Sequence, residues 1–164
     1  MKFMKDALKQ AEKAAAIGEV PIGAVIVQNG KVIARGYNKR ETKKNALLHA
    51  EIDAINKACK KLGGWRLPNA EIYVTLEPCP MCMGAIISAR IEKLYFGAYD
   101  EKSGAAGSVC DLSSALPHKV ETAGGVMEDE CRTVLTDFFK ELRQRPRGEK
   151  KLMLTIKQRE LSAS

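Results

Sequence analysis

Two short stretches of this chain carry residue types that bind transition metals, and the fold must bring them together for that chemistry to occur. The first is His49-Ala50-Glu51 and the second is Pro78-Cys79-Pro80-Met81-Cys82, with 26 residues between them. A catalytic zinc site uses three protein ligands and leaves the fourth position open for water. One imidazole and two thiolates supply such a set. The carboxylate two residues after the histidine then remains available as a proton carrier.

Each part of this pattern also has an ordinary explanation. The Cys-x-x-Cys pair could be a redox pair, half of a structural zinc knuckle or two buried thiols. A histidine before a helical Ala-Glu is most often a surface residue. The combination is more specific, because the chain has only two histidines. It predicts that His49, Cys79 and Cys82 bind one Zn2+ per chain and that Glu51 is the catalytic residue.

The composition is that of one globular domain. The chain has 164 residues, of which 45% are hydrophobic, and this is enough for a core. No run approaches the roughly 18 apolar residues that cross a bilayer, and the first residues lack a signal-peptide core. We therefore expect a cytoplasmic protein that does not contact a membrane. The other cysteines, Cys59, Cys110 and Cys131, do not resemble a disulfide framework and are expected to be small buried apolar residues.

The positive charge is concentrated near the C-terminus. The net charge is +7, and residues 140–164 carry eight Lys or Arg against three Glu. This asymmetry is expected of a nucleic-acid partner, although a solvated helix end with a basic tail explains the charge equally well. We expect a zinc-dependent domain over residues 1–145 and a basic C-terminal tail over residues 146–164.

The hydrophobic pattern predicts an α/β fold. Strands are expected at 20–27, 31–37, 71–76, 91–98 and 120–122, and helices at 2–17, 47–62, 81–89 and 128–143. Asn29-Gly30 predicts a hairpin between the first two strands. The strand, helix, strand order from residue 71 to 98 predicts a crossover with parallel strands. Both halves of the metal site then lie at helix N-termini, where the helix dipole favours thiolates.

Several longer stretches between about residues 5 and 143 add to the zinc pattern. They cover residues 19–25, 49–51, 65–67, 73–82, 96–98, 102–108 and 138–139. In these stretches the chain resembles the bacterial tRNA-specific adenosine deaminases of the cytidine deaminase superfamily. The zinc motif identifies only the superfamily, whereas the segments around Trp65 and from Phe96 to Ser108 indicate the tRNA branch.

The resemblance implies a three-layer α/β/α cytidine-deaminase-like fold, with a five-stranded mixed sheet between helices, and a homodimer. It implies hydrolytic deamination of adenosine to inosine at the wobble position of a tRNA anticodon, with zinc-bound hydroxide as the nucleophile. The partner is then a tRNA anticodon stem-loop. Carried over by position, Asn38 contacts the target nucleoside, and Asp100 and Lys102 lie beside the RNA.

One departure from the family pattern keeps a second function open. In the loop before the last helix the family usually has an Asn-His pair, where this chain has Pro117-His118 in a shorter loop. Because proline has no side-chain hydrogen-bonding group, zinc-dependent deamination of a free nucleobase or nucleoside, of the guanine or cytosine type, is the alternative. A purely structural zinc site is disfavoured, since it would need a fourth His or Cys ligand near the motif.

Overall fold

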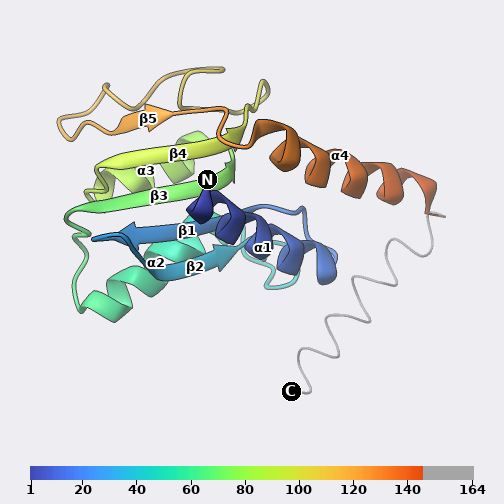
Figure 1. Cartoon of the computed structure of the whole chain (residues 1–164), viewed down its shortest axis with the longest axis horizontal. Helices are drawn as coiled ribbons and strands as arrows, with labels where there is room; N and C mark the ends of the chain where they lie inside the picture. The colour runs from blue at the N-terminus through green and yellow to red at the C-terminus, as the bar shows by residue number, and fades with distance from the viewer. Residues whose placement is uncertain (146–164) are drawn as a thin grey trace.

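The computed structural model describes residues 1–145, which form one sheet and four helices (Figure 1). The predicted basic tail, residues 146–164, lies outside the described residues. In chain order the elements are α1 (Lys2–Ala16), β1 (Gly23–Gln28), β2 (Lys31–Tyr37), α2 (Ala50–Leu62), β3 (Ala70–Leu76), α3 (Pro80–Ser88), β4 (Lys93–Ala98), β5 (Glu121–Ala123) and α4 (Glu128–Gln144).

The five strands form one mixed sheet in the order β2-β1-β3-β4-β5. Strand β1 runs antiparallel to both β2 and β3, whereas β3, β4 and β5 are parallel. The predicted hairpin is present, and its turn residues Asn29 and Gly30 both have positive φ, 51° and 71°. The predicted parallel crossover from β3 through α3 to β4 is also confirmed.

Helices cover both faces of the sheet, which confirms the predicted three-layer α/β/α architecture (Figure 1). Helices α2 and α3 pack on one face around the larger core cluster, and α1 and α4 pack on the other. Glycine permits the close approach of α2 to β2. A Cβ atom on Gly36 would lie 2.2 Å from the Ala50 carbonyl oxygen, at the first residue of α2. This contact fixes where α2 begins relative to the sheet.

Two predicted boundaries differ from the structure by three residues, and the others agree to within two residues. The first strand begins at Gly23 and not at residue 20, because Pro21 has no N–H for a sheet ladder and the Ile22 N–H donates to the Val20 carbonyl. The second helix begins at Ala50 and not at residue 47, because Asn45 accepts a hydrogen bond from the Leu47 N–H in a separate turn.

The expectation for the three remaining cysteines is partly wrong. Cys131 is buried and Cys59 is partly buried, but Cys110 is exposed, in the loop that follows β4. Its neighbours in the sequence, Val109 and Asp111, are exposed as well, so this part of the loop lies at the surface. All five cysteines are free thiols. None of the helices in residues 1–145 combines the length and apolar character that crossing a bilayer requires.

Candidate active site

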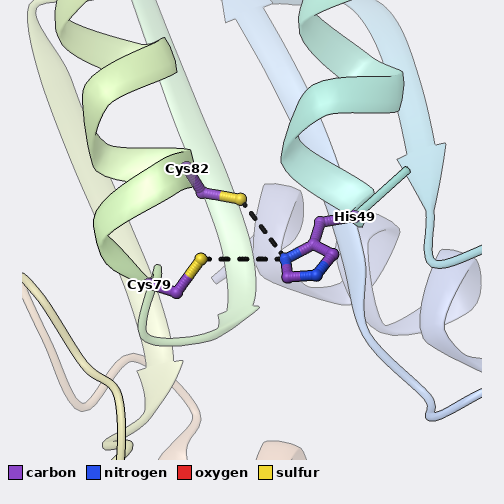
Figure 2. A group of neighbouring side chains, drawn as sticks. All are labelled: His49, Cys79 and Cys82. Carbon is purple, nitrogen blue, oxygen red and sulfur yellow. Dashed lines mark hydrogen bonds between the residues drawn. The ribbon is translucent and has the colours of Figure 1, made fainter. Parts of the chain in front are cut away.

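The fold brings the two predicted halves of the metal site together at the starts of two helices. His49 is the N-cap residue of α2, Cys79 is the N-cap residue of α3, and Cys82 lies in the first turn of α3. The His49 Nδ1 atom lies 3.8 Å from the Cys79 sulfur and 3.6 Å from the Cys82 sulfur (Figure 2). One ligand atom from each residue lies within 4.8 Å of the others, which is close enough for one shared ion.

These distances fit tetrahedral zinc. Zinc–nitrogen bonds of about 2.0–2.1 Å and zinc–sulfur bonds of about 2.3 Å, at a tetrahedral angle, separate N and S by about 3.6 Å. Within residues 1–145 the cluster has three members and does not include Glu51. A three-ligand set leaves one coordination position open, which is the arrangement of catalytic and not of structural zinc sites.

Hydrogen bonds within the cluster give its two thiols different pKa values. The hydrogen bond from Cys82, together with that from His49, lowers the pKa of Cys79 to about 4. The same pairing with Cys79 raises the pKa of Cys82, and the hydrogen bond to Cys79 also raises the pKa of His49. Cys79 is therefore the first thiol to ionise. Both thiols lie at the N-terminus of α3, where the helix dipole favours negative charge.

Glu51 lies in the first turn of α2, with only 4% of its surface exposed. Burial raises the pKa of its carboxyl group to about 7. A carboxyl group with a pKa near neutrality can both accept and release a proton at physiological pH.

A pocket of about 180 Å³ opens in front of the cluster. Its lining comes from both helix starts and from the loops beside them: Val20, Ile22, Asn38, Arg40, His49, Glu51, Leu76, Glu77, Cys79, Asp100 and Ser103. Five of the seven site residues expected from the sequence, Asn38, His49, Glu51, Cys79 and Asp100, therefore line one cavity. The exceptions are Lys102 and Cys82, which is fully buried behind the lining. Lys102 is exposed, and its backbone N–H donates to Asp100 Oδ1 at 3.0 Å.

Asn38 is held firmly in the pocket wall. It is 7% exposed, its amide nitrogen donates to the Val20 carbonyl at 3.3 Å, and its amide oxygen accepts from the Arg40 N–H at 3.2 Å. These two bonds fix which side of the amide is the donor. One N–H of the Asn38 amide remains for a ligand in the pocket.

Sequence reasoning did not assign a role to two buried glutamates beside the pocket. Glu19 Oε1 accepts a hydrogen bond from the Thr42 N–H at 2.6 Å, and Glu77 accepts hydrogen bonds from the loop that begins at Asp100. Both are at most 2% exposed. The only signal in the sequence was a carboxylate next to an apolar strand, and this does not reveal the partners.

His118 lies in the loop where the chain departs from the family pattern. Its Nε2 atom is 2.7 Å from the carbonyl oxygen of Ile91, and neither His118 nor Pro117 lines the pocket. The second histidine of the chain therefore holds a loop against the base of β4 and is separate from the metal-ligand cluster.

The fold and the cluster define a deaminase of the cytidine-deaminase-like class, and the family model of the MafB19-like deaminases matches residues 1–143. A tRNA-specific adenosine deaminase from Bacillus subtilis (strain 168) is 50% identical over 151 residues, which cover 91% of this chain and 94% of that protein. The chain belongs to the family of tRNA-specific adenosine deaminases.

Two solved structures of deaminases are similar to this chain. One comes from studies of A-to-I editing by tRNA:A34 deaminases at the wobble position of transfer RNA. It has a TM-score of 0.77 and 44% identity, and the match covers 82% of this chain and 99% of that chain. A guanine deaminase from Bacillus subtilis has a TM-score of 0.57 and 44% identity, with 60% of this chain and 63% of that chain covered.

Proposed function

We propose that the protein hydrolyses adenosine to inosine at the wobble position of a tRNA anticodon and releases ammonia. The observation that carries this proposal is the cluster of His49, Cys79 and Cys82, because His49 and Cys79 line the same pocket as the buried Glu51. A three-ligand metal set beside a buried proton carrier suits hydrolysis at a ring carbon. Membership of the tRNA-specific adenosine deaminases supports the choice of substrate.

In the proposed mechanism, His49 and the thiolates of Cys79 and Cys82 hold one zinc ion per chain. When bound, this ion would act as a Lewis acid that lowers the pKa of water and makes it a stronger nucleophile near neutral pH. The oxygen of water adds to C6 of adenine while the double bond between C6 and N1 opens, and Glu51 transfers one proton of the water to N1. Glu51 then transfers the second proton to the exocyclic nitrogen, the bond from C6 to this nitrogen breaks, and ammonia leaves. The product keeps the C6 carbonyl and the N1–H of inosine.

The substrate contacts are proposals of the same kind. Asn38 directs its remaining amide N–H at the target nucleoside from the pocket wall. Asp100 lies at the pocket rim and orients the exposed Lys102 beside it, where an ammonium group can meet an RNA phosphate. Arg40, also in the pocket lining, adds a second cation.

We also propose a homodimer located in the cytoplasm, with residues 1–145 as the deaminase domain and residues 146–164 as a basic tail that contacts the RNA. Light scattering measures the dimer directly: the proposal expects a mass near twice the 18.0 kDa of one chain. A mass that stays at one chain at micromolar concentration contradicts it.

The test of the proposed function is the position of the inosine. A tRNA transcript with adenosine at the wobble position is incubated with the protein and sequenced after reverse transcription, because inosine is copied as guanosine. We expect the change at the wobble position alone. The matched control is the same transcript with the wobble adenosine moved one position in the anticodon loop, which we expect to remain unchanged.

Free nucleobases are the main competing substrates, because the same zinc chemistry suits them and because the guanine deaminase structure is similar. Deamination of free guanine or cytosine, with the tRNA transcript unchanged, would replace the proposal with this alternative.

A further inference from the structure

Glu77 follows β3 and comes directly before Pro78 of the metal-binding turn. Its side chain is 2% exposed and accepts four hydrogen bonds. Oε1 accepts hydrogen bonds from the backbone N–H groups of Ala106 and Ser108, each at 3.0 Å. Oε2 accepts the N–H of Asp100 at 3.0 Å and the hydroxyl of Ser108. One carboxylate therefore binds both ends of the loop from residue 100 to 108.

Further contacts hold the same loop against the same turn. The Ala105 N–H donates to the Pro78 carbonyl at 2.8 Å, one residue before the metal ligand Cys79. Gly104 lies so close that a Cβ atom there would be 2.4 Å from the carboxyl carbon of Glu77. The loop thus lies directly on the Glu77 side chain, without room for a larger residue at Gly104.

The donors around Glu77 are neutral. None of the ion pairs within residues 1–145 includes it. A buried carboxylate without a cation must be compensated by hydrogen bonds, and the N–H groups of the loop provide them. The carboxylate and the loop therefore stabilise each other, and the loop cannot move away without leaving a buried acceptor unsatisfied.

The held loop forms one wall of the pocket. Asp100 and Ser103 line the cavity together with Glu77 and Cys79. Asp100 in turn accepts hydrogen bonds from the Lys102 N–H and from both the N–H and hydroxyl of Ser103. The orientation of the groups proposed to meet the RNA is therefore set through Asp100, whose own N–H is bound by Glu77.

We infer that Glu77 is a positioning residue, which couples the substrate-binding loop to the metal-binding turn so that the loop forms a wall of the pocket. The part that concerns RNA rests on the proposed function. Glu77 acts through the loop and does not itself take part in the reaction.

The substitution Glu77→Gln keeps the size of the side chain and exchanges one acceptor oxygen for a donor NH2. If the amide oxygen keeps the Ala106 and Ser108 N–H groups, the NH2 faces the Asp100 N–H, and that bond is lost. The matched control is Glu71→Gln, the same change at the other end of β3. Within residues 1–145, the Glu71 carboxylate accepts a single hydrogen bond, from the Tyr73 hydroxyl.

Glu77→Gln should keep its zinc and raise the KM for an anticodon stem-loop about tenfold, as expected for one lost bond to a charged group. The kcat should change by less than about threefold, because Glu51 and the metal ligands are untouched. Amide hydrogen exchange at Asp100 should become faster. Glu71→Gln should leave all these values as in the wild type. An unchanged KM together with unchanged exchange at residues 100, 106 and 108 would overturn the inference.

Gly104→Ala changes the contact between the loop and the Glu77 carboxylate from the loop side. If Glu77→Gln loses zinc, this second variant tests the coupling in its place. The new methyl group displaces the carboxylate, so KM should rise and the same amides should exchange faster; wild-type values would refute the coupling. If the wild-type protein fails to deaminate tRNA, the proposed function fails. Hydrogen exchange in Glu77→Gln then still tests whether Glu77 holds the loop.

Discussion

Asp53 connects β2, which ends just before Asn38, to α2, which carries Glu51. Replacing Asp53 should therefore lower the stability of the fold. It lies in α2, and its side chain is 11% exposed. Its Oδ2 atom accepts hydrogen bonds from Lys39 Nζ and Lys57 Nζ, both at 2.9 Å, and from the Tyr37 N–H at 3.3 Å. Asp53→Ala removes all three acceptor contacts.

The three contacts are unequal. The Lys39 side chain is only 17% exposed, so its loss of a charged partner should cost about 1.5–3 kcal/mol. Lys57 is 48% exposed and pairs within the helix, so it should add at most about 0.5 kcal/mol. The partly buried Tyr37 N–H should add about 0.5–1 kcal/mol. We expect Asp53→Ala to lower the free energy of unfolding by about 2–4 kcal/mol.

Urea unfolding at fixed zinc concentration measures this difference, and Lys57→Ala is the control. The control should lose no more than about 0.5 kcal/mol. A loss below about 0.5 kcal/mol for Asp53→Ala as well would show that Asp53 does not join β2 to α2, because that is the range of ordinary surface substitutions.

The pH dependence provides a second check on Asp53. Burial would raise its pKa, but the hydrogen bonds from Lys39 and Lys57 outweigh burial and hold the pKa below its ordinary value. The stabilisation is therefore complete above the unfolded-state pKa of about 3.9 and is lost as the pH falls through the lower folded-state pKa. The difference between wild type and Asp53→Ala should be constant from about pH 6 to 8 and should shrink below about pH 4.

Three further predictions concern the site and the tail. The purified protein should contain about one zinc per chain by elemental analysis, and Cys79→Ala or Cys82→Ala should lose both metal and activity; an active protein without metal would contradict this. Glu51→Gln should keep zinc but lose turnover by about 10²–10⁴-fold or more, whereas half of the wild-type rate would rule out Glu51 as the proton carrier. Removing residues 146–164 deletes five Lys or Arg and two Glu. We expect a higher KM for tRNA and a salt slope smaller by about 0.7 per lost phosphate contact, at unchanged saturated turnover; if KM and slope stay constant, the tail does not contact the RNA.

The grouping of His49, Cys79 and Cys82 in space could be predicted from sequence because its parts are local. Cys79 and Cys82 are three residues apart at a helix start that Pro80 favours at the first helical position. Only the meeting of His49 with the two cysteines depends on the fold, and the parallel crossover through α3 brings it about. Spacing and periodicity are sufficient for features of this kind.

The roles of the buried carboxylates Glu19 and Glu77 could not be predicted, because their partners are backbone groups far away in the sequence. Glu77 binds N–H groups 23 to 31 residues later, and Glu19 binds one 23 residues later. Every residue except proline carries such an N–H, so no residue type marks the partner. Cys110 shows the same limit for burial: its exposure depends on where the loop after β4 runs, and the sequence pattern does not determine this path.

The most direct test of the account is ammonia release measured side by side from tRNA, free adenosine, cytidine and guanine, with the wild-type protein and Glu51→Gln. We expect release from tRNA that carries a wobble adenosine, none from the three free compounds, and loss of the tRNA signal in Glu51→Gln. Release from guanine or cytidine without release from tRNA would contradict the proposed substrate. Equal release by wild type and Glu51→Gln would contradict the proposed mechanism.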